Sequence, residues 1–180
     1  VDGNAHIVDQ SVYSSQNRYA ISAIGGVSVT MNDGRIESTN NTAVYINRLG
    51  SSGLQKDHAK FEMTGGTIKG GEYGLKHTQL NEITLSGGTI SGGKNQPDVY
   101  MAWEKNSVSG TAKFTVKGNF PFASMKIESA SKINEIDFTK ATATGEENLQ
   151  INLPWDGNET GANMKLFKAS TSNYRDLLKH

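Results

Sequence analysis

Short runs of alternating apolar and polar residues recur along the first two thirds of the chain. Alternation with a period of two puts successive side chains on opposite faces, so each run predicts a short strand with one buried face. The buried pairs of these first strands are expected at Val29/Met31, Phe61/Met63, Ile83/Leu85 and Phe114/Val116.

A glycine follows each of the first three runs by three positions, at Gly34, Gly66 and Gly88. Glycine at a fixed place after a strand predicts a tight corner, where φ is positive or where a Cβ would obstruct close packing. A second short strand follows each corner, with one isoleucine at its inward position: Ile36, Ile68 and Ile90. A third strand is expected at 19–21, 44–46, 73–75 and 99–101.

Two segments of the sequence that carry this pattern are nearly identical. MTGGTIKGG at 63–71 and LSGGTISGG at 85–93 begin 22 positions apart, and a weaker copy, MNDGRIEST, occupies 31–39. Repetition at such a period is typical of a solenoid in which each copy forms one coil. Three strands per coil predict an all-β fold, a parallel β-helix with coils of about 22 residues. The alternative is an antiparallel sandwich, which gives no reason for GGTI to recur at a fixed interval.

The length fits one β-helix domain over 1–180. We expect regular coils over 19–117, then degenerate coils and an irregular C-terminal cap over 118–180. Terminal coils of solenoids are atypical because they cover an open end. Further strands are expected at 125–129, 133–138, 149–153 and 164–169, with a short helical turn at 174–179.

The composition narrows the function classes. Eighteen basic residues balance eighteen acidic ones, so we expect no nucleic-acid partner. The chain has no apolar run long enough to predict membrane insertion. Cysteine is absent, which excludes a thiolate zinc site and a cysteine nucleophile and is compatible with an extracellular location.

The GGTISGG phrase, with DVYMA shortly after it, resembles the glycine-rich repeats of bacterial cell-surface proteins in the pectate-lyase-like, right-handed parallel β-helix group. The resemblance is clearest over 27–117. It implies an extracellular or cell-surface module that acts in adhesion, with a glycan or a host surface protein as its partner, or as a rigid spacer. The same group also includes polysaccharide lyases, glycoside hydrolases and phage tailspikes, which remain alternatives.

The sequence offers little for catalysis. A glycosidase needs two carboxylates about 5–10 Å apart, and in the regular coils only Glu62 and Glu82 suggest such a pair, at strand positions that should face outward. The Asp-Asp and Gly-His-Gly signatures of polygalacturonase-like enzymes are missing. The four histidines lack metal-ligand spacing and are expected on the surface, and 156–159 is read as a turn rather than a calcium loop. We therefore expect no catalytic residue, no metal and no cofactor.

Two insertions of about ten residues interrupt the regular period, at 47–60 and 103–112. Loops on a rigid scaffold vary without disturbing the stacked coils, so binding residues concentrate there. Trp103 is the expected aromatic anchor of a ligand-binding flank, because an aromatic ring at a loop edge can stack on a sugar or anchor a protein contact. Its expected polar companions are Arg48, Lys56, His58 and Lys105. The alternative is that Trp103 packs over the corner of its own coil.

Overall fold

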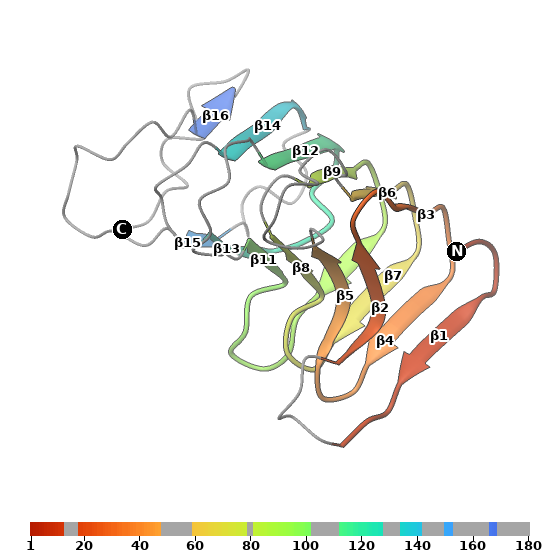
Figure 1. Cartoon of the computed structure of the whole chain (residues 1–180). Coiled ribbons are helices and arrows are strands. Elements are labelled where there is room, and N and C mark those ends of the chain that lie inside the picture. The colour runs from red at the N-terminus through yellow and green to blue at the C-terminus, as the bar shows by residue number, and fades with distance from the viewer. Residues whose placement is uncertain are drawn as a thin grey trace.

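The computed structural model describes eight segments of the chain, namely residues 1–12, 18–47, 59–78, 81–101, 112–127, 134–141, 150–152 and 166–168. Within these segments all regular structure is β, in three sheets of parallel strands (Figure 1). The arrangement is consistent with a β-helix-like fold. The antiparallel sandwich is wrong for these strands, because all their pairings are parallel.

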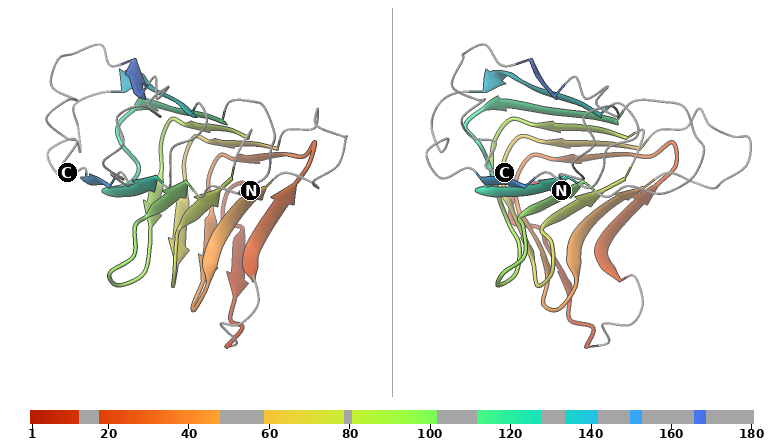
Figure 2. Two further views of the ribbon diagram at one scale, coloured as in Figure 1. Left: turned by 60° about the vertical axis from the view of Figure 1, so that its left-hand side comes forward. Right: turned by 90° about the vertical axis from the view of Figure 1, so that its left-hand side faces the viewer.

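The chain visits the three sheets in turn, and each early strand pairs with the strand three places later. Sheet A contains β1 (His6–Asp9), β4 (Arg35–Ser38), β7 (Thr67–Gly70) and β10 (Thr89–Ser91). Sheet B contains β2 (Tyr19–Ile24), β5 (Thr42–Asn47), β8 (Leu75–His77), β11 (Val99–Met101), β13 (Ser124–Ile127) and β15 (Gln150–Asn152). Sheet C contains β3 (Ser28–Met31), β6 (Lys60–Met63), β9 (Glu82–Leu85), β12 (Ala112–Gly118), β14 (Asn134–Ala141) and β16 (Leu166–Lys168). Figure 2 shows the strands of each sheet side by side along one direction.

The predicted isoleucine column is confirmed. Ile36 pairs with Ile68, Ile68 pairs with Ile90, and all three are buried. Ile7 of β1 pairs with Ile36 and extends the column by one strand that the sequence pattern did not predict. β1 was missed because His6 pairs with Arg35, which puts Ala5, and not a glycine, at the position equivalent to Gly34.

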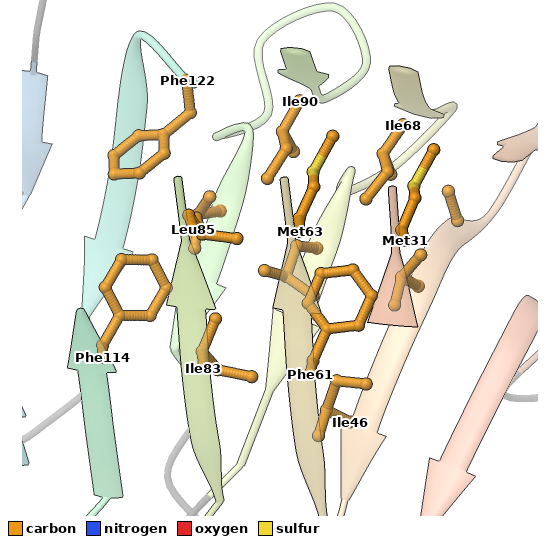
Figure 3. Close-up of a cluster of buried hydrophobic side chains, with 14 of the residues drawn as sticks. Met31, Ile46, Phe61, Met63, Ile68, Ile83, Leu85, Ile90, Phe114 and Phe122 are labelled. Atoms are coloured by element: carbon orange, nitrogen blue, oxygen red, sulfur yellow. The ribbon is translucent and has the colours of Figure 1, made fainter. Parts of the chain in front are cut away.

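The core lies between the three sheets and takes side chains from each of them (Figure 3). The first strands contribute two side chains each at the expected positions, of which Val29 is only partly buried and the rest are buried. Phe120 and Phe122, which follow β12, also pack on this core and contact each other edge to face. Burial of side chains of this size is worth about 1.5–3 kcal/mol each, so the stack is stabilised coil by coil.

The third strands lie near the expected places but partly out of register with the prediction. Leu75–His77 forms the strand expected at 73–75, and Tyr19 pairs with Thr42 rather than with Val44. Aligning 73–75 with 44–46 matched Leu75 to Ile46, whereas in the structure Leu75 pairs with Val44 and with Val99. The consequence is that His77, and not Leu75, pairs with Ile46 and Met101. The hydrophobic alternation gave the wrong register for β8 because this strand places a histidine, His77, at an inward position.

The glycine corners are confirmed as positive-φ turns. Gly34, Gly66 and Gly88 have φ of +87°, +83° and +85°. A Cβ on Gly66 would also lie 2.7 Å from the carbonyl oxygen of Gly34 in the preceding coil, and a Cβ on Gly88 would lie 2.7 Å from that of Gly66. Both conformation and space therefore require glycine.

Gly66→Ala is expected to destabilise the protein by more than the roughly 1–2 kcal/mol of left-handed strain alone, because the Cβ also meets backbone. Gly118→Ala is the matched control. Gly118 has φ +73°, but the nearest atom to its Cβ would be a carbonyl oxygen at an ordinary 3.7 Å. Urea denaturation should show a larger fall in the free energy of unfolding for Gly66→Ala than for Gly118→Ala. Equal losses would show that close stacking is not a reason for glycine at the corner.

Candidate ligand-binding sites

The ligand-binding flank expected from the sequence lies outside the described residues. This applies to every residue proposed for it: Trp103, Arg48, Lys56, His58 and Lys105. It applies also to the 156–159 turn and the 174–179 helical turn. Among the hollows that the described residues line, we compare one over each sheet.

The hollow over sheet C has a volume of about 330 Å³ and contains both Glu62 and Glu82. The sequence suggested that the two carboxylates occupy equivalent positions on adjacent strands. The register contradicts this, because Glu82 pairs with Lys60 and Glu62 pairs with Thr84. Lys60 Nζ lies 2.9 Å from Glu82 Oε2. Because Glu82 is held in this ion pair, the two carboxylates do not form the pair of general acid and general base that glycoside cleavage requires.

The hollow over sheet A has a volume of about 390 Å³ and is lined by a mixed set of charges that includes Arg35, Glu37 and Lys69. Arg35 donates to Glu37 Oε1 at 2.5 Å, and His6 Nε2 lies 3.0 Å from Glu37 Oε2. The hydrogen bond from Arg35 outweighs partial burial and lowers the pKa of Glu37. This carboxyl is therefore ionised and unsuited to act as a general acid.

The hollow over sheet B, called here the sheet-B hollow, is the largest of the three at about 720 Å³. Its lining combines two aromatic rings, opposite charges and small polar groups: Tyr19, Tyr45, Arg18, Asp9, Ser22, Asn47 and the apolar Ile24. Tyr19 and Tyr45 stack with ring centroids 4.2 Å apart and an interplanar angle of 24°.

The stack continues as a column on the outer face of sheet B. The register places Tyr45, Lys76, Tyr100 and Lys126 at successive outward positions of β5, β8, β11 and β13. Lys76 Nζ lies 5.5 Å from the Tyr45 centroid and 5.6 Å from that of Tyr100, and Lys126 Nζ lies 5.4 Å from the Tyr100 centroid. These are cation–π distances, so each lysine holds its neighbouring rings in place. Alignment of the third strands in their true register would have revealed this column from sequence alone.

Asp9 closes one end of the sheet-B hollow and is held by a polar network at the corner between sheets A and B. The backbone N–H of Ser11 donates to Asp9 Oδ1 at 3.0 Å. The Ser38 hydroxyl and the Asn41 amide donate to Asp9 Oδ2 at 2.8 and 3.3 Å. Partial burial alone would raise the pKa of Asp9, but these hydrogen bonds outweigh it and lower the pKa to about 2.

Asp98 has a structural role. Its carboxylate accepts hydrogen bonds from the backbone N–H groups of Gly92, Ala123 and Ser124, at 2.8 to 2.9 Å. Asn81, fully buried, acts similarly at another corner, where its Oδ1 accepts from the Ala59 N–H and its Nδ2 donates to the Ile46 carbonyl. Both side chains satisfy backbone groups and are not candidates for chemistry.

His77 corrects the expectation that the histidines lie on the surface. It is fully buried, and neither ring nitrogen has a hydrogen-bond partner. The ring stacks on Phe114 at a centroid distance of 5.9 Å. Burial lowers the pKa of His77 to about 4, because desolvation disfavours the charged imidazolium.

The described residues contain no group of three or more His, Cys, Asp or Glu side chains arranged to hold a metal ion. In the same part of the chain, no helix is long and apolar enough to cross a membrane. Comparison with known proteins finds no matching family model, curated protein or solved structure.

Proposed function

We propose that the chain is a right-handed parallel β-helix module of an extracellular bacterial surface protein. The module is not an enzyme. It binds a glycan or a host surface protein in adhesion, and its stacked coils act as a rigid spacer that carries the binding surface. The observation that carries this proposal is the sheet-B hollow, where a fixed pair of aromatic rings adjoins opposite charges on a rigid sheet.

The β-helix assignment draws its support from the register. The corresponding strands of four successive coils pair in parallel. In sheet A, this pairing puts Ile7, Ile36, Ile68 and Ile90 in one column. The distance between paired residues is 22 positions from Ile68 to Ile90, as in the sequence repeat. Sheet A ends at β10, whereas sheets B and C continue, which fits a coil that degenerates into a cap.

The absence of catalysis is proposed from the state of the carboxylates. Glu37 and Glu82 are in ion pairs, Asp98 accepts backbone hydrogen bonds, and Glu72 Oε2 accepts from the Thr42 hydroxyl at 3.1 Å. A general acid for glycoside cleavage needs a raised pKa, whereas the carboxyl pKa shifts at Asp9 and Glu37 are both downward.

Incubation of the protein with pectin, polygalacturonate and host-type glycans is expected to release no new reducing ends, while a glycan array reveals binding. One arrangement favours the carbohydrate-active alternative: Glu62 and Glu82 share the sheet-C hollow. Any activity should therefore be compared with that of Glu82→Gln and Glu62→Gln. Release of reducing ends that either variant abolishes would replace the proposal with a glycoside-cleaving enzyme.

A further inference from the structure

We propose that the sheet-B hollow binds an uncharged oligosaccharide, with one sugar unit against the Tyr19–Tyr45 pair; this inference rests on the proposed function. The hollow is distinct from the loop flank expected from the sequence. Its volume of about 720 Å³ lies within the range of roughly 300–1,000 Å³ that is usual for small-molecule sites.

The aromatic part of the hollow is organised before any ligand arrives. The Tyr19 ring stacks on Tyr45, and Lys76 lies over Tyr45 from the next strand. Tyr45 is buried, with only 8% of its surface exposed, so its ring has little freedom to lose on binding. Ile24 adds an apolar side chain with 42% of its surface exposed. An aromatic and an aliphatic side chain on one wall fit the C–H face of a sugar ring.

The polar part supplies a fixed negative charge and hydrogen-bond donors. Asp9 is ionised at neutral pH and is fixed by hydrogen bonds from Ser11, Ser38 and Asn41. A carboxylate has about four acceptor positions. The backbone and side chain of Ser11, with Ser38 and Asn41, already donate to Asp9, so it acts in the hollow as a fixed negative charge. Arg18 and the exposed Ser22 add donors to the same lining.

The charges select the class of sugar. Arg18 and Asp9 contribute one positive and one negative charge to the lining, and the remaining lining residues are uncharged. An acidic sugar would gain from Arg18 but would be repelled by a carboxylate that is held in place and ionised. A neutral sugar meets no such repulsion and can hydrogen-bond with the Arg18 guanidinium and the Ser22 hydroxyl.

The test is a solution titration of neutral and acidic oligosaccharides against the wild-type protein and three variants. The neutral set contains galactose, mannose, glucose and N-acetylglucosamine oligomers, and the acidic set contains oligogalacturonate and sialylated and sulfated glycans. We expect binding within the neutral set that changes by less than about twofold between low and high salt, because screening affects only charged contacts.

Tyr19→Ala is expected to weaken that binding by about tenfold, as loss of an aromatic contact worth roughly 1.4 kcal/mol would do. The matched control is Tyr73→Ala. The Tyr73 ring contacts Tyr100 with centroids 4.5 Å apart and an interplanar angle of 32°, close to the geometry of Tyr19 and Tyr45, but Tyr73 lies outside the hollow. Tyr73→Ala should leave the affinity for the neutral sugar within about twofold of wild type. Ser22→Glu adds bulk and charge at an exposed, outward position and should weaken binding without affecting folding.

Three results overturn the inference while leaving the proposed function intact: preference for acidic sugars, equal weakening by Tyr19→Ala and Tyr73→Ala, or unchanged binding by Ser22→Glu together with loss of binding by Trp103→Ala. The last would place the site on the flank expected from the sequence. Absence of binding to every glycan would also overturn the inference and would leave a host surface protein as the ligand of the proposed function. Cleavage of a glycan would instead overturn the proposed function itself.

Discussion

Ile68→Asp is expected to abolish cooperative folding. Ile68 lies between Ile36 and Ile90 in adjacent strands, and all three side chains are buried. Figure 3 shows Ile68 and Ile90 side by side in the core. An unpaired carboxylate at that position has no partner to compensate for lost hydration, at a cost of about 3–5 kcal/mol or more. That is comparable with the whole free energy of unfolding of a domain, typically about 5–15 kcal/mol. Circular dichroism during thermal denaturation measures the effect.

Two controls separate the buried charge from other effects. Lys69→Asp places the same carboxylate on the neighbouring residue, which is exposed, and is expected to stay folded. Ile68→Val removes one methylene from the core and is expected to lower the free energy of unfolding by about 0.5–1.5 kcal/mol. Melting of Ile68→Asp within a few degrees of wild type would show that the isoleucine column is not the core.

The free energy of unfolding is expected to fall by about 3 kcal/mol as the pH falls from about 6.5 to 4, because of His77. The folded-state pKa of His77 is about 4, against an ordinary value of 6.5, since burial of the ring disfavours the imidazolium more than the Thr78 backbone favours it. The unfolded state therefore binds the proton more readily in this window. The contribution of His77 is complete above pH 6.5 and is lost as the pH falls toward 4. Urea denaturation at several pH values measures this slope.

His77→Met is the variant that tests the assignment. A methionine fills a similar volume and matches Met101, which pairs with His77 in the next strand. The variant should be more stable than wild type at pH 7, because an unsatisfied buried N–H costs about 1–3 kcal/mol. It should also lose the pH dependence between 6.5 and 4.

Asp9 provides an internal comparison. Its pKa is lowered to about 2, so its contribution to the free energy of unfolding is lost only as the pH falls below about 4. His77→Met should retain that acid loss. A pH slope between 6.5 and 4 that survives in His77→Met would assign the effect to other groups.

The sequence predicted the strands and the corners between them well where residue chemistry permits one conformation. Gly34, Gly66 and Gly88 stand at corners with positive φ, which glycine adopts without strain, so their spacing identified the corners. The alternating pairs and the isoleucine column followed from the period of two along a strand. The strand positions near 125, 134, 150 and 166 were also found from sequence, although the repeat there is weak.

The sequence was misleading at the third strand of each coil. Its inward positions include His77, and its outward positions include Tyr45 and Tyr100, which are themselves buried. A hydrophobicity pattern does not distinguish these faces, because one inward residue is polar and two outward residues are aromatic. The alignment therefore slipped by two residues at Tyr73–Leu75, and both the buried histidine and the Tyr–Lys column were missed.

The chain by itself determined its period, its corner glycines and its parallel core, because backbone conformation and burial at these positions depend on local residue type. Only the tertiary structure decided what lies on the outer faces. Tyr19 and Tyr45, or Asp9, Ser38 and Asn41, come from different coils and meet only after stacking. Outward residues are not constrained by burial in the core, so nothing local in the sequence marks which of them become neighbours.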